Sequence, residues 1–167
     1  MIPFETVHLP VQWIALVVRP RAERNVQARL ANANIESFVP WHRVRRRWSD
    51  RVKLLEENLF PGYVFCRSTF EERFLVLKQP GVKSVVGSIP EPEIAALRRT
   101  ITSDLPLGPW PFLRSGQKVR VEHGVLAGIV GTLVRDCSGW RVVLSIDSLQ
   151  QSIAVEVDRD MIRPMER

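Results

Sequence analysis

The sequence has little cysteine. Its 167 residues include two, Cys66 and Cys137, which lie far apart and have no neighbour at CxxC spacing. Neither a disulfide framework nor a zinc site is therefore indicated. Two such thiols fit a reducing compartment, so we expect a cytoplasmic protein.

Long hydrophobic runs are also missing. The apolar run VQWIALVV at residues 11–18 is far shorter than the ~20 residues that span a bilayer. The N-terminus lacks the basic region that opens a secretory signal. We expect no signal, no anchor and no transmembrane helix.

Catalytic motifs are absent as well, since GxSxG, P-loop and GxGxxG patterns do not occur. The histidines His8, His42 and His123 are scattered, and none lies at the sequence spacing from a cysteine or an acid that metal sites use. Cys66, in an apolar segment, is interpreted as a packed thiol and His123 as a turn residue. We expect no enzyme activity, no cofactor and no metal.

Positive charge is concentrated in one segment. The chain is 45% apolar and 25% charged, as in ordinary globular proteins, and carries a net charge of +6. WHRVRRRWSDRVK, residues 41–53, contains six basic residues and one acid, Asp50, and so contributes +5 of that charge. This segment suggests nucleic acid as a partner, with Trp41 or Trp48 available for stacking, although a merely solvated hairpin explains the charge equally well. The candidate contacts are Arg43, Arg45, Arg46, Arg47, Arg51 and Lys53.

The first part of the chain alternates strand and helix patterns. Four segments have patterns typical of strands: WIALVV (13–18), IESFVP (35–40), residues 63–66 and VKSVVG (82–87). Helices are predicted over 21–33, with Glu23 on the polar face, over 69–78 and from about residue 90. The second begins with a capping box, Thr69 to Glu72, and carries Phe70, Phe74 and Leu77 as an apolar stripe. The basic segment is predicted to be a hairpin or a mobile loop. An α+β domain over 10–102 follows, with helices flanking an antiparallel sheet.

The rest of the chain has the twofold period of strands. Residues 103–112 are rich in proline and are predicted to be a linker. Beyond them KVRVEHG, GIVGTLV, WRVVLSID and SIAVEVD are short strand patterns, and MIR is a candidate fifth. We expect a small all-β, SH3-like barrel over 113–167.

One short stretch, LFPGYVF at residues 59–65, places a Pro-Gly turn between strand-like residues. Proline restricts its own φ and glycine tolerates positive φ, so the aromatic side chains on each side are held at a rigid corner. Large rings with few rotamers suit an interface, but ordinary core aromatics explain the same residues.

These features together resemble the NusG/RfaH family of transcription elongation factors, from Trp13 to Met165. WIALVVRP at 13–20, FVP at 38–40, LFPGYVF at 59–65 and PGVKSVVG at 80–87 follow the order of the family's NGN domain. VRVEHGVLAGIVGTLV at 119–134 resembles its KOW motif, with the glycines at the turn and the strand crossing: Gly124, Gly128 and Gly131. Two departures are Ile14, where many relatives have Tyr, and Glu72 to Leu75, where RfaH has a His-Thr-Thr-Thr run that contacts the opposite pincer of the polymerase.

The resemblance implies how the protein works. In this family an apolar pocket of the NGN domain binds the clamp helices of RNA polymerase, which implies contacts by Phe60, Pro61, Tyr63 and Phe65 here. DNA or RNA of the elongation complex is implied next to the basic segment. The KOW domain is implied to bind a ribosomal protein or Rho, or to refold into helices that mask the polymerase site, although its β-branched composition favours a stable barrel.

The expected function is therefore transcription elongation and antitermination by a monomeric, specialised NusG paralogue. A KOW-type RNA-binding or ribosome-associated module is the alternative.

Overall fold

The computed structural model describes residues 10–113 and 116–166. Their contacts form two compact units. The first contains the described residues up to Val39 together with Gly62–Pro90, and the second contains Pro40–Pro61 together with the described residues from Glu91 onward.

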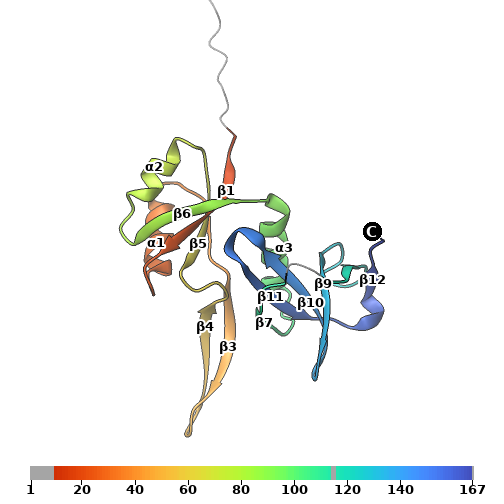
Figure 1. Cartoon of the computed structure of the whole chain (residues 1–167). Helices are drawn as coiled ribbons and strands as arrows, with labels where there is room; N and C mark the ends of the chain where they lie inside the picture. Colours follow the sequence, from red (N-terminus) through yellow and green to blue (C-terminus); the bar gives the residue numbers. More distant parts are fainter. Residues whose placement is uncertain (1–9, 114–115, 167) are drawn as a thin grey trace, which may run out of the picture. The chain divides into compact units, whose positions relative to one another are not determined.

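The first unit is built on a four-stranded antiparallel sheet with the order β2-β5-β1-β6 (Figure 1). The central strand β1 is the predicted apolar run, and its residues Trp13 to Leu16 are almost completely buried. A strand with neighbours on both edges and covered faces requires such a continuous apolar sequence. The strands are β1 (Gln12–Val18), β2 (Ser37–Phe38), β5 (Tyr63–Ser68) and β6 (Val82–Ile89).

Two helices belong to this unit, α1 (Glu23–Asn32) and α2 (Glu72–Leu77). The α1 helix buries Val26 and Leu30, one turn apart, as its period predicts. At the start of α2 the capping box is confirmed, since the Glu72 N–H donates to Thr69 Oγ1 (3.2 Å) and the Thr69 N–H donates to Glu72 Oε2 (2.8 Å).

The apolar stripe of α2 does not serve the core. Phe70, Phe74 and Leu77 are 77%, 63% and 44% exposed, and Val76 is the residue that α2 buries. A helix of six residues makes fewer than two turns, so a short side chain facing the sheet is enough to anchor it.

In the second unit, the basic segment forms the hairpin of β3 (Trp41–Arg47) and β4 (Val52–Asn58). Seven residue pairs align, from Trp41 opposite Asn58 to Arg47 opposite Val52. Figure 1 shows the hairpin as a long two-stranded ribbon. Of the two predicted alternatives, hairpin or mobile loop, the structure contains the hairpin.

The remainder of this unit is α3 (Glu91–Thr102) and an antiparallel all-β sheet with the order β12-β8-β9-β10-β11-β7. The last strand pairs with β8, and Val119, Val142 and Val155 are among the fully buried core residues. The strands are β7 (Leu107–Trp110), β8 (Lys118–Val121), β9 (Val130–Asp136), β10 (Gly139–Ile146), β11 (Gln151–Glu156) and β12 (Ile162–Pro164). Two 3₁₀ turns, Asp147–Leu149 and Arg159–Met161, connect them. The expected α+β class, with an all-β C-terminal part, is confirmed.

Part of the segment predicted to be a linker is a strand. Residues 107–110 form β7, which pairs with β11 at one edge of the sheet. Pro109 lies opposite Ile153 there, and an edge strand tolerates a proline because one of its sides has no neighbour. The hairpin and α3, which the sequence assigned to the 10–102 domain, belong to the second compact unit. The domain boundaries at 102 and 113 stay a prediction.

Candidate functional site

The Pro61-Gly62 corner is held by hydrogen bonds from two elements. Gly62 has a φ of +84°, a backbone conformation that residues with a side chain disfavour and glycine adopts readily. Its N–H donates to Glu23 Oε1 (2.9 Å), and its carbonyl accepts from the Val18 N–H (2.8 Å). The end of β1 and the first turn of α1 therefore set the direction in which β5 leaves the corner.

Glu23 was not predicted to have this role. The helical period places Glu23 on the polar face of the helix, but its exposed fraction is only 7%. A carboxylate in the first turn of a helix is favoured by the helix dipole, which was the available signal. The correction follows from the fold, because only the tertiary structure brings Gly62 next to α1.

The four residues proposed for polymerase binding differ in accessibility. Phe60 and Phe65 are fully buried, and the Phe65 ring stacks on Phe38 with a centroid distance of 6.1 Å. Tyr63, opposite Val17 in the sheet, is half-buried, and Pro61 is exposed. Of these four side chains, only those of Pro61 and Tyr63 are therefore accessible to a partner.

All the basic residues of the candidate nucleic-acid site are exposed on or between β3 and β4. One of them is paired: Arg46 donates from Nη2 and Nε to Glu57 Oε1 at 2.8 and 3.1 Å. At the tip, the Trp48 N–H donates to the Arg51 carbonyl (2.8 Å), and Lys53 Nζ lies 5.8 Å from the centre of the Trp48 ring. The hairpin thus collects the predicted residues on one small element.

The three glycines of the KOW-like segment lie where a side chain is disfavoured. Gly124 and Gly128 have φ values of +82° and +89°, in the loop between β8 and β9. At Gly131 in β9, a Cβ atom would clash with the Val142 side chain and lie 2.6 Å from the Val143 carbonyl oxygen. These glycines permit the turn and the close approach of β9 to β10.

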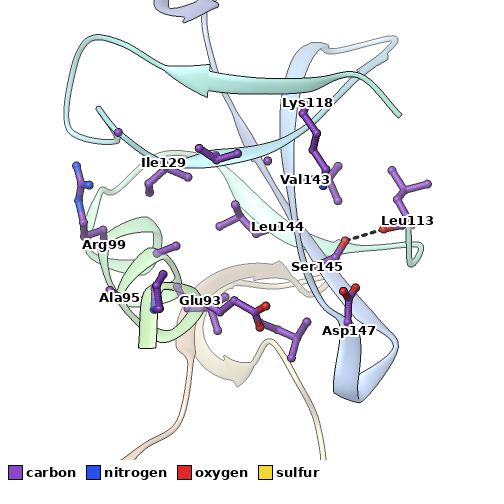
Figure 2. A pocket seen from close by; sticks show the side chains of 17 residues that line it. Glu93, Ala95, Arg99, Leu113, Lys118, Ile129, Val143, Leu144, Ser145 and Asp147 are labelled. Carbon is purple, nitrogen blue, oxygen red and sulfur yellow. Dashed lines mark hydrogen bonds between the residues drawn. The ribbon is translucent and has the colours of Figure 1, made fainter. Parts of the chain in front are cut away.

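A cavity of about 480 Å³ within the second unit was not predicted from the sequence (Figure 2). It is lined by α3 and by strands of the C-terminal sheet, and Ser145 Oγ donates there to the Leu113 carbonyl (3.0 Å). Burial raises the pKa of Glu93 above its usual value, and the nearby Asp147 carboxylate raises it further. Arg99, which also lines the cavity, donates from Nη2 to the carbonyls of Val125 (3.0 Å) and Ala127 (2.7 Å). The cavity is thus a mixed polar and apolar space beside α3.

The thiol and acid groups form no metal-binding cluster in the described ranges. Cys66 in β5 is fully buried, and this desolvation raises its pKa to about 12, so the thiol stays protonated. Within residues 10–113 and 116–166, no group of three or more His, Cys, Asp or Glu side chains is placed to bind a metal ion. No helix in those ranges is long and apolar enough to cross a membrane.

A helix-flanked antiparallel sheet with an aromatic Pro-Gly corner is followed by a small all-β sheet with a glycine-containing turn, and this is the arrangement that the resemblance to NusG-like transcription factors implies. A family model described as "Transcription termination factor nusG" matches residues 11–102. The chain belongs to the NusG family of transcription termination and antitermination factors, so the resemblance inferred from the sequence is confirmed.

Similar proteins support this assignment. "Transcription termination/antitermination protein NusG" of Lactococcus lactis subsp. lactis (strain IL1403) is 27% identical over 158 residues, which cover 86% of this chain and 83% of that protein. A solved structure titled "Domain interaction in Thermotoga maritima NusG" has a TM-score of 0.56 at 16% identity and covers 94% of this chain and 98% of its own. The second likeness concerns the fold alone.

Proposed function

We propose that this protein is an elongation and antitermination factor that binds the clamp helices of RNA polymerase through its Pro61-Gly62 corner. The observation that carries this proposal is the corner itself. It has an exposed proline and a half-buried tyrosine on a backbone fixed by Glu23 and Val18.

The corner has the properties of an interface anchor. A tyrosine buries a large apolar area on binding and loses little rotamer entropy, while its hydroxyl can donate a hydrogen bond. Because Gly62 is hydrogen-bonded on both sides, little backbone ordering is left to oppose association. Phe60 and Phe65 are buried, so they support the site from within while Pro61 and Tyr63 make the contact.

Nucleic acid is the proposed second partner. The exposed basic side chains of the hairpin suit the DNA or RNA that an elongation complex contains. An attachment to both the clamp and nucleic acid favours the closed clamp, so pausing is reduced and elongation becomes more processive. This concentration of charge on one hairpin is our reason for proposing a specialised NusG paralogue, acting as a monomer in the cytoplasm.

The C-terminal sheet is proposed to contact a further protein, either a ribosomal protein or Rho. An alternative function is a KOW-type RNA-binding or ribosome-associated module. The glycine-containing loop at Gly124 and Gly128 is compatible with either function. An RNA-binding module has no need for a rigid aromatic corner, and this difference makes the two functions separable.

The test is retention of purified core RNA polymerase, free of nucleic acid, on the immobilised full chain. We expect the wild-type chain to retain polymerase, and Tyr63→Ala to weaken the affinity on the order of tenfold or more, as for an interface hot spot. Circular dichroism melting of each variant shows whether the fold is intact.

Trp48→Ala is the matched control, because Trp48 is also an accessible aromatic residue (53% exposed) but lies at the tip of the hairpin. Equal retention by Tyr63→Ala and wild type would reject the corner as the anchor. If the wild-type chain does not retain polymerase but sediments with ribosomes, the alternative function is correct.

A further inference from the structure

The C-terminal sheet contains a second cavity, of about 530 Å³, whose lining residues all belong to the second unit. Its apolar lining includes Val121 and Leu126, which are almost completely buried, and Met161, which is half-buried. The side chain of Trp140, half-buried in β10, forms part of the wall. The volume lies within the ~300–1,000 Å³ that is typical of pockets for small molecules.

Trp140 lies where the core of the sheet ends. Residues directly opposite each other in an antiparallel pair lie on the same face, and alternate residues of one strand share a face. Trp140 is therefore on the same face as Val142, which is fully buried, and as Arg135, its partner in β9. At this end of β9 and β10 the core face thus changes from aliphatic residues to an indole ring beside a cation.

The position of Trp140 is fixed by the turn between β9 and β10. The Asp136 carboxylate accepts a hydrogen bond from the Ser138 N–H (2.8 Å), which closes the turn. Arg141 Nε donates to the same carboxylate at 2.7 Å, and Arg141 Nη2 donates to Glu156 on β11 at 2.8 Å. These bonds join three strands next to the cavity, so little ordering of the backbone is left to oppose a ligand.

Two guanidinium groups lie against the Trp140 ring. The guanidinium carbon of Arg135 is 5.2 Å from the ring centre, and that of Arg159 is 4.8 Å from it. Both arginines are exposed, and neither has an ion pair in the part of the chain that the structure describes. Contact with the ring restricts these long side chains, so an anion that binds them has less rotamer entropy to remove. The two arginines form a cationic edge next to an apolar cavity.

The lining also contains two carboxylates, and they limit how much negative charge a ligand can carry. Glu156 is paired with Arg141 at 2.8 Å, whereas Asp158 is exposed and is next to Arg159 in the sequence. A polyanion such as RNA would bring further phosphates close to these acids, which like charges disfavour. A ligand with one charge and a compact apolar body suits the site, because its charge meets the arginines while its body fills the cavity.

We propose that this cavity binds a small organic anion with a flat apolar body. The body packs against Val121, Leu126 and Met161, and the anionic group is held by Arg135 and Arg159. The inference goes beyond the proposed function and does not depend on polymerase binding. It gives the C-terminal sheet a ligand site in addition to the protein contact proposed for it.

The test is titration of the full chain with naphthoate, which has a two-ring apolar body and one carboxylate. Two-dimensional proton–nitrogen NMR records the indole N–H of each tryptophan separately, and Trp140→Phe identifies the Trp140 signal by its loss. Naphthamide is the matched ligand control, because it has nearly the same shape and no charge. We expect the Trp140 signal to shift saturably with naphthoate, and naphthamide to bind on the order of tenfold more weakly, as for the loss of a charged hydrogen bond.

The double variant Arg135→Gln with Arg159→Gln should weaken naphthoate binding on the order of tenfold and leave the binding of naphthamide nearly unchanged. The control is Arg120→Gln with Arg163→Gln, which also removes two charges from exposed arginines of the same sheet. Arg120 and Arg163 are directly opposite each other and share a face, and Arg120 precedes the buried Val121, so both point away from the core. Since salt screens distant exposed charges, the control should bind naphthoate within about twofold of wild type.

Equal affinities for naphthoate and naphthamide would overturn the proposal, because the arginines would then contribute nothing. Equal losses in the two double variants would overturn it too, as would a titration that shifts other tryptophan signals but not that of Trp140. Tighter binding of oligouridylate than of naphthoate at the Trp140 signal would reject it in favour of an RNA site. The backbone N–H signals of each variant show whether its fold is intact.

Discussion

Residues 41–58 and residues 59–68 are adjacent segments that are both largely strand, yet they differ in how far their side chains are exposed to solvent. In the hairpin the side chains from Arg45 to Leu54 are all exposed. In the next segment Leu59, Phe60, Phe65 and Cys66 are at most 2% exposed. Most hairpin side chains therefore face solvent, whereas most side chains of the corner and β5 pack in the core.

Stability and binding are therefore separable within one stretch of about thirty residues. Removing a buried apolar side chain costs both transfer free energy and a cavity, whereas an exposed charge contributes little to folding. Substitutions of the buried residues in the corner segment are expected to change the free energy of unfolding, and substitutions in the hairpin to change mainly the binding of partners.

The largest contrast is expected in thiol reactivity. At pH 8 a thiol with a pKa of about 12 is almost entirely protonated, and Cys66 is also sterically covered, whereas Cys137 is exposed. Alkylation with iodoacetamide under native conditions, followed by mass spectrometry, should modify Cys137 alone. In concentrated urea both cysteines should react. Rapid native labelling of Cys66 would show that β5 is not buried as described.

Phe60→Ala should give the largest change in stability. Truncating a fully buried phenylalanine lowers the free energy of unfolding by about 3–5 kcal/mol. Urea denaturation followed by circular dichroism measures the loss. The exposed aromatic Trp48 supplies the comparison, since Trp48→Ala should cost less than about 0.5 kcal/mol. Similar losses in both variants would abolish the distinction between the two segments.

Gly62→Ala should have an intermediate effect. The nearest atom to an added Cβ is the Val18 carbonyl oxygen at 4.0 Å, so there is space, but a φ of +84° costs an L-residue about 1–2 kcal/mol. Gly87→Ala in β6 is the matched control, because Gly87 has no neighbour within 4 Å of such a Cβ and no positive φ. Thermal melting of the two variants makes the comparison, and equal midpoints would contradict a strained corner.

The Arg46–Glu57 pair should have the smallest effect. Its side chains are 55% and 37% exposed, and exposed ion pairs contribute about 0.2–1 kcal/mol. A double-mutant cycle with Arg46→Gln and Glu57→Gln isolates the coupling energy. The coupling should fall toward zero in high salt, because bulk ions screen exposed charges. A salt-independent coupling above this range would mean that the hairpin carries core-like interactions.

Much of the local structure was predictable from the sequence. The capping box of Thr69 and Glu72 needs only residues three apart, and the strand patterns of the C-terminal sheet need only a twofold period. The exposure of Phe70 and Phe74 was not predictable, because a period identifies a face but not whether another element covers it. The β7 strand was not recognised because it contains Pro109 and is flanked by Pro106 and Pro111, but an edge position tolerates a proline.

The candidate site divides in the same way. The Pro-Gly turn and the charge of the hairpin follow from residue types alone. The burial of Phe60, the Glu23 contact with Gly62 and the pairing of Arg46 with Glu57 depend on which segments the fold brings together.

Residue types and their spacing along the chain therefore set the local, additive features: the turn at Pro61-Gly62, the periods of strands and helices, the net charge of residues 41–53 and the family motifs. The folded structure is needed to tell which aromatic rings are core, which carboxylate holds the corner and which arginines share a face. The physical reason is that burial and hydrogen bonding between distant segments are properties of pairs of residues in space, and a linear pattern contains only neighbours.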